Sequence, residues 1–317
     1  MINVGVIGVG YLGRHHARIY SGLEGVRLAA VVDSDRAAAE RIAAEYGGEA
    51  CSDYLEILGK VDALSIVTPT TAHFGIAMEC IKLGKHLLIE KPITVTVEEA
   101  DSLIEAAEKS GSIIQVGHLE RFNPAIRALS PLLGDPVFIE AERLSPFQGR
   151  GIDVDITLDL MIHDIDIILS IIRKQGKEEK SPAIKDIKAT GSMMLTGNID
   201  IARAWLEFEG GVQALMTANR LYSEKSRKLR VFQEDSYFVV DYQDMEIRRF
   251  FREGDNIIDE LITVEKKEPL KEELRDFVEC IADRRKPVVS AVQGRDALKI
   301  ALQINSVIRQ SADRRNI

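Results

Sequence analysis

One histidine and four aspartates stand within the apolar stretch VDITLDLMIHDIDIILSII, residues 154–172. No Pro or Gly interrupts this stretch, so we expect it to form one helix. Burying charged groups costs several kcal/mol unless they are paired or used, so we expect these groups to line a cleft. At about 100° per residue, four of these side chains fall within about 80° of one another and form a stripe, namely Asp155, Asp159, His163 and Asp166. The side chain of Asp164 points roughly away from this stripe.

Two other interpretations of Asp159 and His163 are open. Because they are spaced i, i+4, they could form an ordinary pair on a solvated helix face. A carboxylate and an imidazole could also bind a metal ion. No further His or Cys lies nearby in the sequence, so we expect no metal site.

A glycine-rich turn follows the first apolar, strand-like run, residues 2–8. A helix-like segment comes next, and a second strand-like run ends about 20 residues later at an acid. Glycines let the backbone approach a pyrophosphate, and the N-terminus of the following helix offers free N–H groups to it. This context indicates a dinucleotide-binding unit. The predicted cofactor-binding residues here are Gly8, Gly10, Tyr11, Leu12, Gly13 and Asp33.

Asp33 also bears on the choice of cofactor. A carboxylate at this position accepts hydrogen bonds from the ribose hydroxyls and repels a 2′-phosphate. The sequence therefore favours NAD over NADP, although Arg36 lies close enough in sequence to soften that preference.

The alternation of strands and helices continues to residue 118. Strand-like runs 61–69, 86–92 and 112–118 are separated by helical segments, which predicts a doubly wound parallel sheet. Ligands bind at the carboxyl ends of such strands. Further cofactor contacts are therefore expected at the ends of these runs and just after them, and they are Thr68, Pro69, His73, Glu90 and Lys91.

The tripeptide Glu90-Lys91-Pro92, following the glycine turn, resembles the Gfo/Idh/MocA oxidoreductases. The resemblance covers essentially the whole chain, including the closing segment 270–308. It implies a Rossmann domain, placed at 1–121, and an α+β substrate-binding domain, 122–317, with a large, mostly antiparallel open sheet. Seven strand-like runs between residues 137 and 251 independently indicate such a sheet. A cis peptide before Pro92 is common in that family.

The same resemblance implies roles for the catalytic residues. Asp159 and His163 match the family's Asp-x-x-x-His on the helix that faces the nicotinamide. His163 would be the general base, and Asp159 would orient it or bind a sugar hydroxyl. Lys91 would hold the reacting oxygen or relay the proton.

The segment GHLERFNP, residues 117–124, follows the last strand of the Rossmann domain. Arg121 and Asn123 are candidate substrate contacts, although Asn123-Pro124 could equally begin a helix. Within the family, this segment and the LDLMIHDID wording are most similar to UDP-N-acetylglucosamine 3-dehydrogenases, where an Arg could contact the diphosphate.

The predicted function is therefore NAD-dependent oxidation of a secondary hydroxyl of a sugar or nucleotide sugar, with the 3-hydroxyl of UDP-N-acetylglucosamine as a candidate. Alternatives are an inositol or polyol dehydrogenase, an imine or ketone reductase, and a non-catalytic NAD(H)-responsive sensor. The sensor is disfavoured because it would not need a proton acceptor such as His163 together with Lys91.

Composition narrows the remaining possibilities. The 317 residues carry a net charge of -9, which argues against broad nucleic-acid binding. We expect no secretory signal and no membrane span, since no apolar run approaches about 20 residues. Three scattered cysteines fit a reducing cytoplasm. We expect a homo-oligomer, a dimer or tetramer, that pairs through the C-terminal sheet.

Overall fold

The computed structural model describes residues 1–147, 149, 154–176 and 181–313. The chain divides into two compact units, Met1–Leu119 with Glu268–Arg295, and Glu120–Lys267 with Asp296–Ile317. The division near residue 120 lies close to the boundary expected at 121. Residues 268–295, which the sequence-based division placed in the second domain, belong instead to the first unit.

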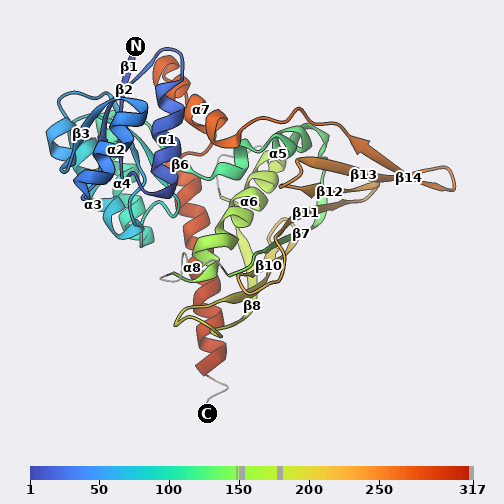
Figure 1. Ribbon diagram of the computed structural model, residues 1–317. Coiled ribbons are helices and arrows are strands. Elements are labelled where there is room, and N and C mark those ends of the chain that lie inside the picture. Colours follow the sequence, from blue (N-terminus) through green and yellow to red (C-terminus); the bar gives the residue numbers. More distant parts are fainter. Residues whose placement is uncertain (148, 150–153, 177–180, 314–317) are drawn as a thin grey trace. The chain divides into compact units, whose positions relative to one another are not determined.

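The first unit is built on a six-stranded parallel sheet in the order β3-β2-β1-β4-β5-β6 (Figure 1). This confirms the predicted doubly wound sheet, because the order reverses beside β1 as it does in Rossmann folds. The strands are β1 (Ile2–Ile7), β2 (Val26–Val32), β3 (Glu49–Cys51), β4 (Ala63–Ile66), β5 (His86–Glu90) and β6 (Ile114–Gly117).

Helices pack around this sheet, and one of them comes from the end of the chain. The helices are α1 (Tyr11–Ser21), α2 (Arg36–Tyr46), α3 (Thr70–Lys82), α4 (Val97–Ser110) and α7 (Pro269–Asp283). Leu274 and Phe277 of α7 are fully buried in the same core cluster as Tyr20 of α1. This packing explains why residues 268–295 join the first unit.

The second unit is built on an eight-stranded sheet in the order β14-β13-β12-β11-β7-β10-β9-β8. Neighbouring strands are antiparallel except for the pair β7 and β10. The mostly antiparallel sheet is thus confirmed. Its strands are β7 (Pro136–Leu144), β8 (Ile184–Ser192), β9 (Ile201–Phe208), β10 (Gln213–Asn219), β11 (Ser226–Gln233), β12 (Ser236–Asp241), β13 (Glu246–Glu253) and β14 (Asn256–Ile262).

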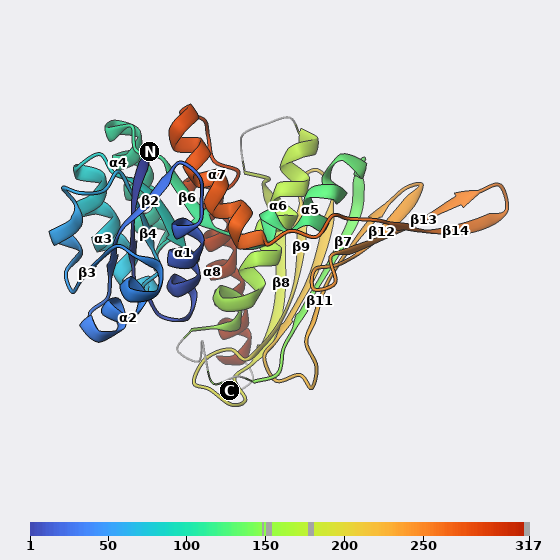
Figure 2. The ribbon, with the colours of Figure 1, turned by 45° about the horizontal axis from the view of Figure 1, so that its top comes forward.

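Strand β14 was not predicted from the sequence. It lies at the edge of the sheet beside β13, and its side chains are mostly exposed, so it has no alternation of apolar and polar residues to reveal it. In Figure 2, β13 and β14 form a ribbon that extends beyond the rest of this sheet.

Helices cover one face of the second sheet. They are α5 (Pro124–Leu129), a π-helical turn η4 (Thr157–Met161), α6 (Ile162–Gly176) and α8 (Ala291–Asp313). Alternate residues of β10, such as Met216, are buried in one cluster with Ile165 of α6 and Ile304 of α8. The other face of the sheet carries no helix among the residues described. Among all the residues that the structure describes, no helix is both long and apolar enough to cross a membrane.

Arg143 ties helix α6 to the sheet from inside this core. It lies on β7, and only 2% of its surface is exposed. Its Nε and Nη2 donate to both carboxylate oxygens of Asp164 on α6, at 3.0 and 2.9 Å. Its Nη1 donates to Oε1 of Glu120 at 2.9 Å. A buried guanidinium bonded to two carboxylates fixes the position of α6 on the strand.

Glu120 depends on this cationic environment. Burial alone would raise the pKa of Glu120, but the charges of Arg143 and Arg227 outweigh burial and hold that pKa below its usual range. The ionised carboxylate is therefore the native form, and its energy is coupled to folding.

Replacing the buried Arg143 should lower the free energy of unfolding far more than replacing a paired arginine near the surface. We predict that Arg143→Met lowers the free energy of unfolding by about 3–5 kcal/mol, because Asp164 and Glu120 would lose their counter-charge while buried. The matched control is Arg230→Met. Arg230 pairs with Glu140 at 3.2 Å with both side chains partly exposed, so its loss should cost less than about 1 kcal/mol. Urea unfolding measures both, and equal losses would contradict this account.

The depressed pKa of Glu120 predicts the sign of an acid-dependent stability change. Its contribution is fully present above the pKa of the unfolded state, about 4.3, and is lost as pH falls through the lower folded-state pKa. Glu120→Gln should therefore flatten the dependence of unfolding free energy on pH below about 4.5. An unchanged acid slope in this variant would show that Glu120 is not a coupled group.

Candidate functional site

The glycine turn after β1 has the geometry needed for close backbone approach. Gly8 has φ +85°, and a Cβ atom there would lie 2.6 Å from the carbonyl oxygen of Val67. At Gly13 a Cβ atom would lie only 1.8 Å from the carbonyl oxygen of Gly8. At Gly10, by contrast, no described heavy atom outside the immediate chain neighbours lies within 4 Å of that position. The turn is thus packed on its inner side and open at Gly10, which fits a pyrophosphate resting on the N-terminus of α1.

Asp33 follows β2 directly and contacts the same turn. Its Oδ2 accepts from the backbone N–H of Val9 at 2.9 Å, and its Oδ1 accepts from that of Asp35 at 3.0 Å. Arg36 is bonded to Glu40 on its own helix at 3.0 Å. The carboxylate is therefore held against the turn, and the neighbouring arginine is engaged with another acid, an arrangement that fits NAD.

Thr68 and Pro69 lie where β4 ends, and His73 lies beneath them on α3. The Nε2 of His73 is 2.9 Å from the carbonyl oxygen of Thr68, and its Nδ1 is 3.0 Å from that of Pro92. Burial lowers the pKa of His73, more than these contacts raise it. Both ring nitrogens are directed at the backbone, so His73 links the loops after β4 and β5. We therefore assign the side chain of His73 this structural role instead of the predicted contact with the cofactor.

Glu90 and Lys91 lie at the end of β5, the next strand along the sheet. Glu90 is buried, and its Oε2 accepts from the backbone N–H of Lys91 at 3.2 Å. The peptide between Lys91 and Pro92 is cis. On the other side, Nε2 of His16 lies 3.3 Å from Oε1 of Glu90. The carboxylate therefore joins the Lys91 turn to helix α1.

His16 follows the glycine turn on the first helix, where the sequence favours a surface position, but in the structure it is fully buried. Its spacing was the available signal, because it shares the buried face of α1 with Gly13, Ala17 and Tyr20. Within the first unit, the glycine turn, Asp33, Thr68, Pro69, Glu90 and Lys91 all lie at the carboxyl ends of parallel strands, as predicted.

In the second unit, Asp159 lies in the π turn η4 and His163 in the first turn of α6. Both side chains are half-buried. The predicted stripe of four groups is not a regular feature of one α-helix, because the π turn changes the angle between successive residues. Asp164 does not point to solvent either, since it is buried against Arg143.

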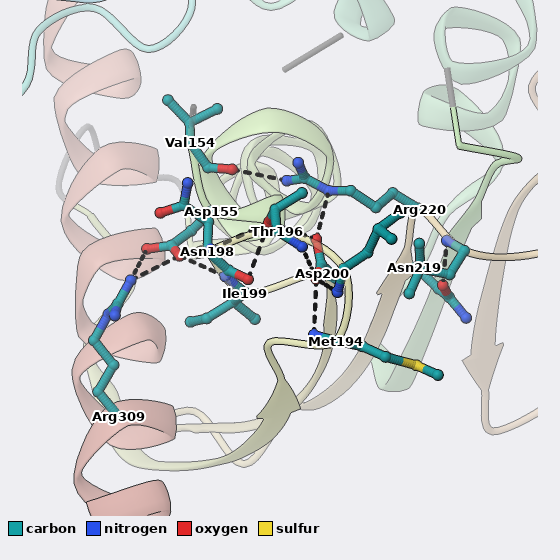
Figure 3. A network of polar contacts seen from close by, with 12 residues as sticks. Val154, Asp155, Met194, Thr196, Asn198, Ile199, Asp200, Asn219, Arg220 and Arg309 are labelled. Atoms are coloured by element: carbon teal, nitrogen blue, oxygen red, sulfur yellow. Dashed lines mark hydrogen bonds and ion pairs between the residues drawn. The ribbon is translucent and has the colours of Figure 1, made fainter. Parts of the chain in front are cut away.

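Asp155, the first predicted member of the stripe, serves to anchor the helix. It accepts from Nη2 of Arg309 on α8 at 2.8 and 3.0 Å and from Nδ2 of Asn305 at 2.9 Å. It also accepts from the backbone N–H of Ile199 at 2.8 Å (Figure 3). Assigning Asp155 to a ligand-lining stripe was therefore wrong, because all these partners belong to the protein itself.

Asp200 holds the loop that lies beside this anchor (Figure 3). Its Oδ2 accepts three successive backbone N–H groups, at 2.8, 2.7 and 3.0 Å, from residues 194–196. Burial would raise the pKa of Asp200, but these hydrogen bonds outweigh burial and lower it. Arg220, close to Asp200, donates to the carbonyl oxygen of Val154 at 2.8 Å. The start of the site helix is therefore fixed from α8 and from the β8–β9 loop.

The two predicted substrate contacts of the 117–124 segment differ in their surroundings. Asn123 is buried and caps α5, accepting from the backbone N–H of Ala125 at 3.0 Å and donating to the carbonyl oxygen of Tyr242 at 3.0 Å. The helix-start interpretation of Asn123 is thus confirmed, and the amide is committed to the cap rather than to a substrate. Arg121 lies 3.4 Å from Asp166, which removes Asp166 from the stripe as well.

Comparisons with known proteins match this arrangement. The model of the oxidoreductase family with an NAD-binding Rossmann fold matches residues 2–118. UDP-N-acetylglucosamine 3-dehydrogenase of Acidithiobacillus ferrooxidans is 37% identical over 314 residues, 97% of each chain. A solved structure of that enzyme superposes with a TM-score of 0.90 over 97% of each chain. The NAD(+)-dependent scyllo-inositol 2-dehydrogenase of Bacillus subtilis is 26% identical over 97% of this chain and 94% of its own.

The matched region contains the open glycine turn, Asp33 and the Glu90-Lys91-Pro92 turn at the ends of parallel strands. The relative at 37% identity extends the match over 97% of this chain, and so through the second unit. The chain is therefore an oxidoreductase with an NAD-binding Rossmann fold, and it belongs to the Gfo/Idh/MocA family.

Proposed function

We propose that this protein is an NAD-dependent dehydrogenase of a nucleotide sugar, with the 3-hydroxyl of UDP-N-acetylglucosamine as the leading candidate. The observation that carries the proposal is the 37% identity, along 97% of both chains, with a dehydrogenase named for that substrate. The local sequences of the two predicted substrate segments, GHLERFNP and LDLMIHDID, support the same substrate.

Oxidation of a secondary alcohol must remove a hydride from carbon and a proton from oxygen. NAD held by the glycine turn and Asp33 would supply the hydride acceptor. In this proposal His163 accepts the hydroxyl proton, since an imidazole titrates near neutral pH. Asp159 orients the imidazole or binds a neighbouring hydroxyl. Lys91 stabilises the negative charge that develops on the oxygen.

A second candidate is oxidation of an inositol. The observation in its favour is the match to scyllo-inositol 2-dehydrogenase, which also spans 97% of this chain, although at 26% identity. Both candidates use the same hydride chemistry and differ in whether the substrate carries a nucleoside diphosphate.

We further propose that the protein is a homo-oligomer, a dimer or tetramer, formed through the open face of the second sheet. Five aromatic rings form a continuous row across this face, with successive centroids 5.4, 5.6, 5.0 and 4.8 Å apart. An apolar row of this kind on a face without a covering helix is typical of a subunit interface. The rings belong to Trp205, Phe138, Phe232, Tyr237 and Phe250.

A cytoplasmic location fits the state of the cysteines. Cys51, Cys80 and Cys280 are free thiols, and all three are buried. Free thiols are stable in a reducing compartment. We therefore propose that the enzyme works in the cytoplasm.

The general-base role predicts a selective loss of turnover. His163→Ala should lower kcat for UDP-N-acetylglucosamine by about 10²–10⁴-fold, while NADH binding stays close to that of the wild type. The matched control is Ser170→Ala on the same helix, whose hydroxyl donates to the carbonyl oxygen of Ile167, and it should retain activity. NADH formation at 340 nm and fluorescence titration of NADH measure the two effects. Full activity in His163→Ala would rule out the role.

The interface proposal predicts that a charge within the aromatic row weakens assembly. Phe232→Glu should shift the sedimentation coefficient from that of an oligomer to that of a monomer, because a carboxylate would be desolvated at the contact. Lys271→Glu, on an exposed position of α7, changes charge elsewhere and should leave assembly intact. A wild-type protein that sediments as a monomer would contradict the proposal.

A further inference from the structure

Two arginines lie directly opposite each other on the helix-covered face of the second sheet. Arg227 of β11 is paired in register with Arg143 of β7. Like charges at directly opposed positions destabilise an antiparallel pair unless something compensates them. The contacts of the nearby carboxylates therefore determine how far the charge of each arginine is neutralised.

Those acids mainly serve Arg143. Asp164 gives both oxygens to Arg143, and Oε1 of Glu120 accepts from it at 2.9 Å. Nη1 of Arg227 reaches the same Oε1 at 3.3 Å, and the other oxygen of Glu120 accepts from Asn123. Arg227 thus shares an acceptor that is already in use, and 33% of its side chain remains exposed. Its positive charge is only partly compensated.

Lys225 adds a second cation near Arg227. Lys225 directly precedes β11, two residues before Arg227, and the charge of Arg227 is the largest influence on its ammonium group. Its side chain is exposed, and among residues 1–147, 149, 154–176 and 181–313 its ammonium group has no hydrogen-bond or ion-pair partner. Apart from the contact between Nη1 of Arg227 and Glu120, the two side chains therefore present donors that no described carboxylate accepts from.

The electrostatic behaviour of both cations agrees with this. Burial and the charge of Arg143 lower the pKa of Arg227, against the opposing effect of Glu120, Asp164 and Asp159. The pKa of Lys225 is lowered first by the charge of Arg227 and then by burial. An anion bound between them would relieve both. The charge of Asp159 also acts on Arg227, which is consistent with Arg227 lying near the turn that carries Asp159.

We propose that Arg227 and Lys225 form the subsite that binds the diphosphate of the nucleotide-sugar substrate. This inference rests on the proposed function. A guanidinium offers two parallel N–H donors to phosphate oxygens, and an ammonium adds a point charge beside them. The subsite replaces the sequence-based expectation for Arg121, which lies against Asp166. Inositols have no diphosphate and would not use it.

The direct test is binding of UDP, and separately of inorganic pyrophosphate, to the purified full chain by calorimetry. Losing a charge-assisted contact should weaken UDP binding by about tenfold or more in Arg227→Gln, and by several-fold in Lys225→Ala. Lys228→Ala removes the same charge from the adjacent position of β11, whose side chain points to the opposite face, so it should leave UDP affinity unchanged.

Kinetics then separate this proposal from the proposed function. With UDP-N-acetylglucosamine, Arg227→Gln and Lys225→Ala should raise KM by similar factors with little change in kcat. An unchanged KM in both variants of an enzyme that oxidises this substrate would overturn the subsite alone. UDP binding that depends on Arg227, in a protein that oxidises no nucleotide sugar, would overturn the function and support the subsite. A wild-type chain that binds neither UDP nor pyrophosphate would overturn the subsite. Because Lys225 is exposed, its variant keeps the test decisive if Arg227→Gln fails to fold.

Discussion

The buried guanidinium of Arg143 is the interaction on which the second unit depends. It joins the central strand β7, helix α6 through Asp164, and the segment before α5 through Glu120. A buried charge left without its partners costs several kcal/mol, so the three elements have little freedom to shift independently. Because Asp164 is next to His163 in sequence, the same ion pair sets the orientation of the helix at the proposed general base.

The ionisable groups of the apolar stretch divide by role. Asp155, Asp164 and Asp166 each face an arginine of the same unit, and they anchor the helix at its start, on its buried side and near Arg121. Asp159 and His163 are the two that stay half-buried around the π turn. Such turns widen a helix locally and often occur at functional sites. The stretch is charged because three of its four acids are structural, which leaves Asp159 and His163 for chemistry.

Much of the fold could be predicted because its patterns are local. The glycine turn, the apolar strands and Asp33 follow one another in a fixed order, and each element's period can be read from neighbouring residues. Strand β14 was not predicted because its mostly exposed side chains do not alternate between apolar and polar. The site was harder to predict. A helical wheel contains no information about a π turn, or about Arg143 and Arg309, which come from distant parts of the chain and pair with Asp164 and Asp155.

The same limit explains the errors at single residues. An asparagine such as Asn123 is common both as a helix cap and as a substrate contact. The backbone geometry of α5 distinguishes these two roles. His73 follows a strand end where a cofactor contact is plausible, yet two carbonyl groups face its ring. Arg227 gave no sequence signal, because its importance arises from the register of β11 on β7.

The most direct test of the account is to follow the hydrogen on carbon 3 of the sugar. UDP-N-acetylglucosamine carrying deuterium at that position would be incubated with the protein and NAD, and the reduced cofactor analysed by mass spectrometry. The account predicts that the deuterium appears in the reduced cofactor and that a 3-keto sugar forms. Unlabelled reduced cofactor formed from this substrate would place the chemistry at another carbon. Reduction only with inositols would contradict the nucleotide-sugar assignment.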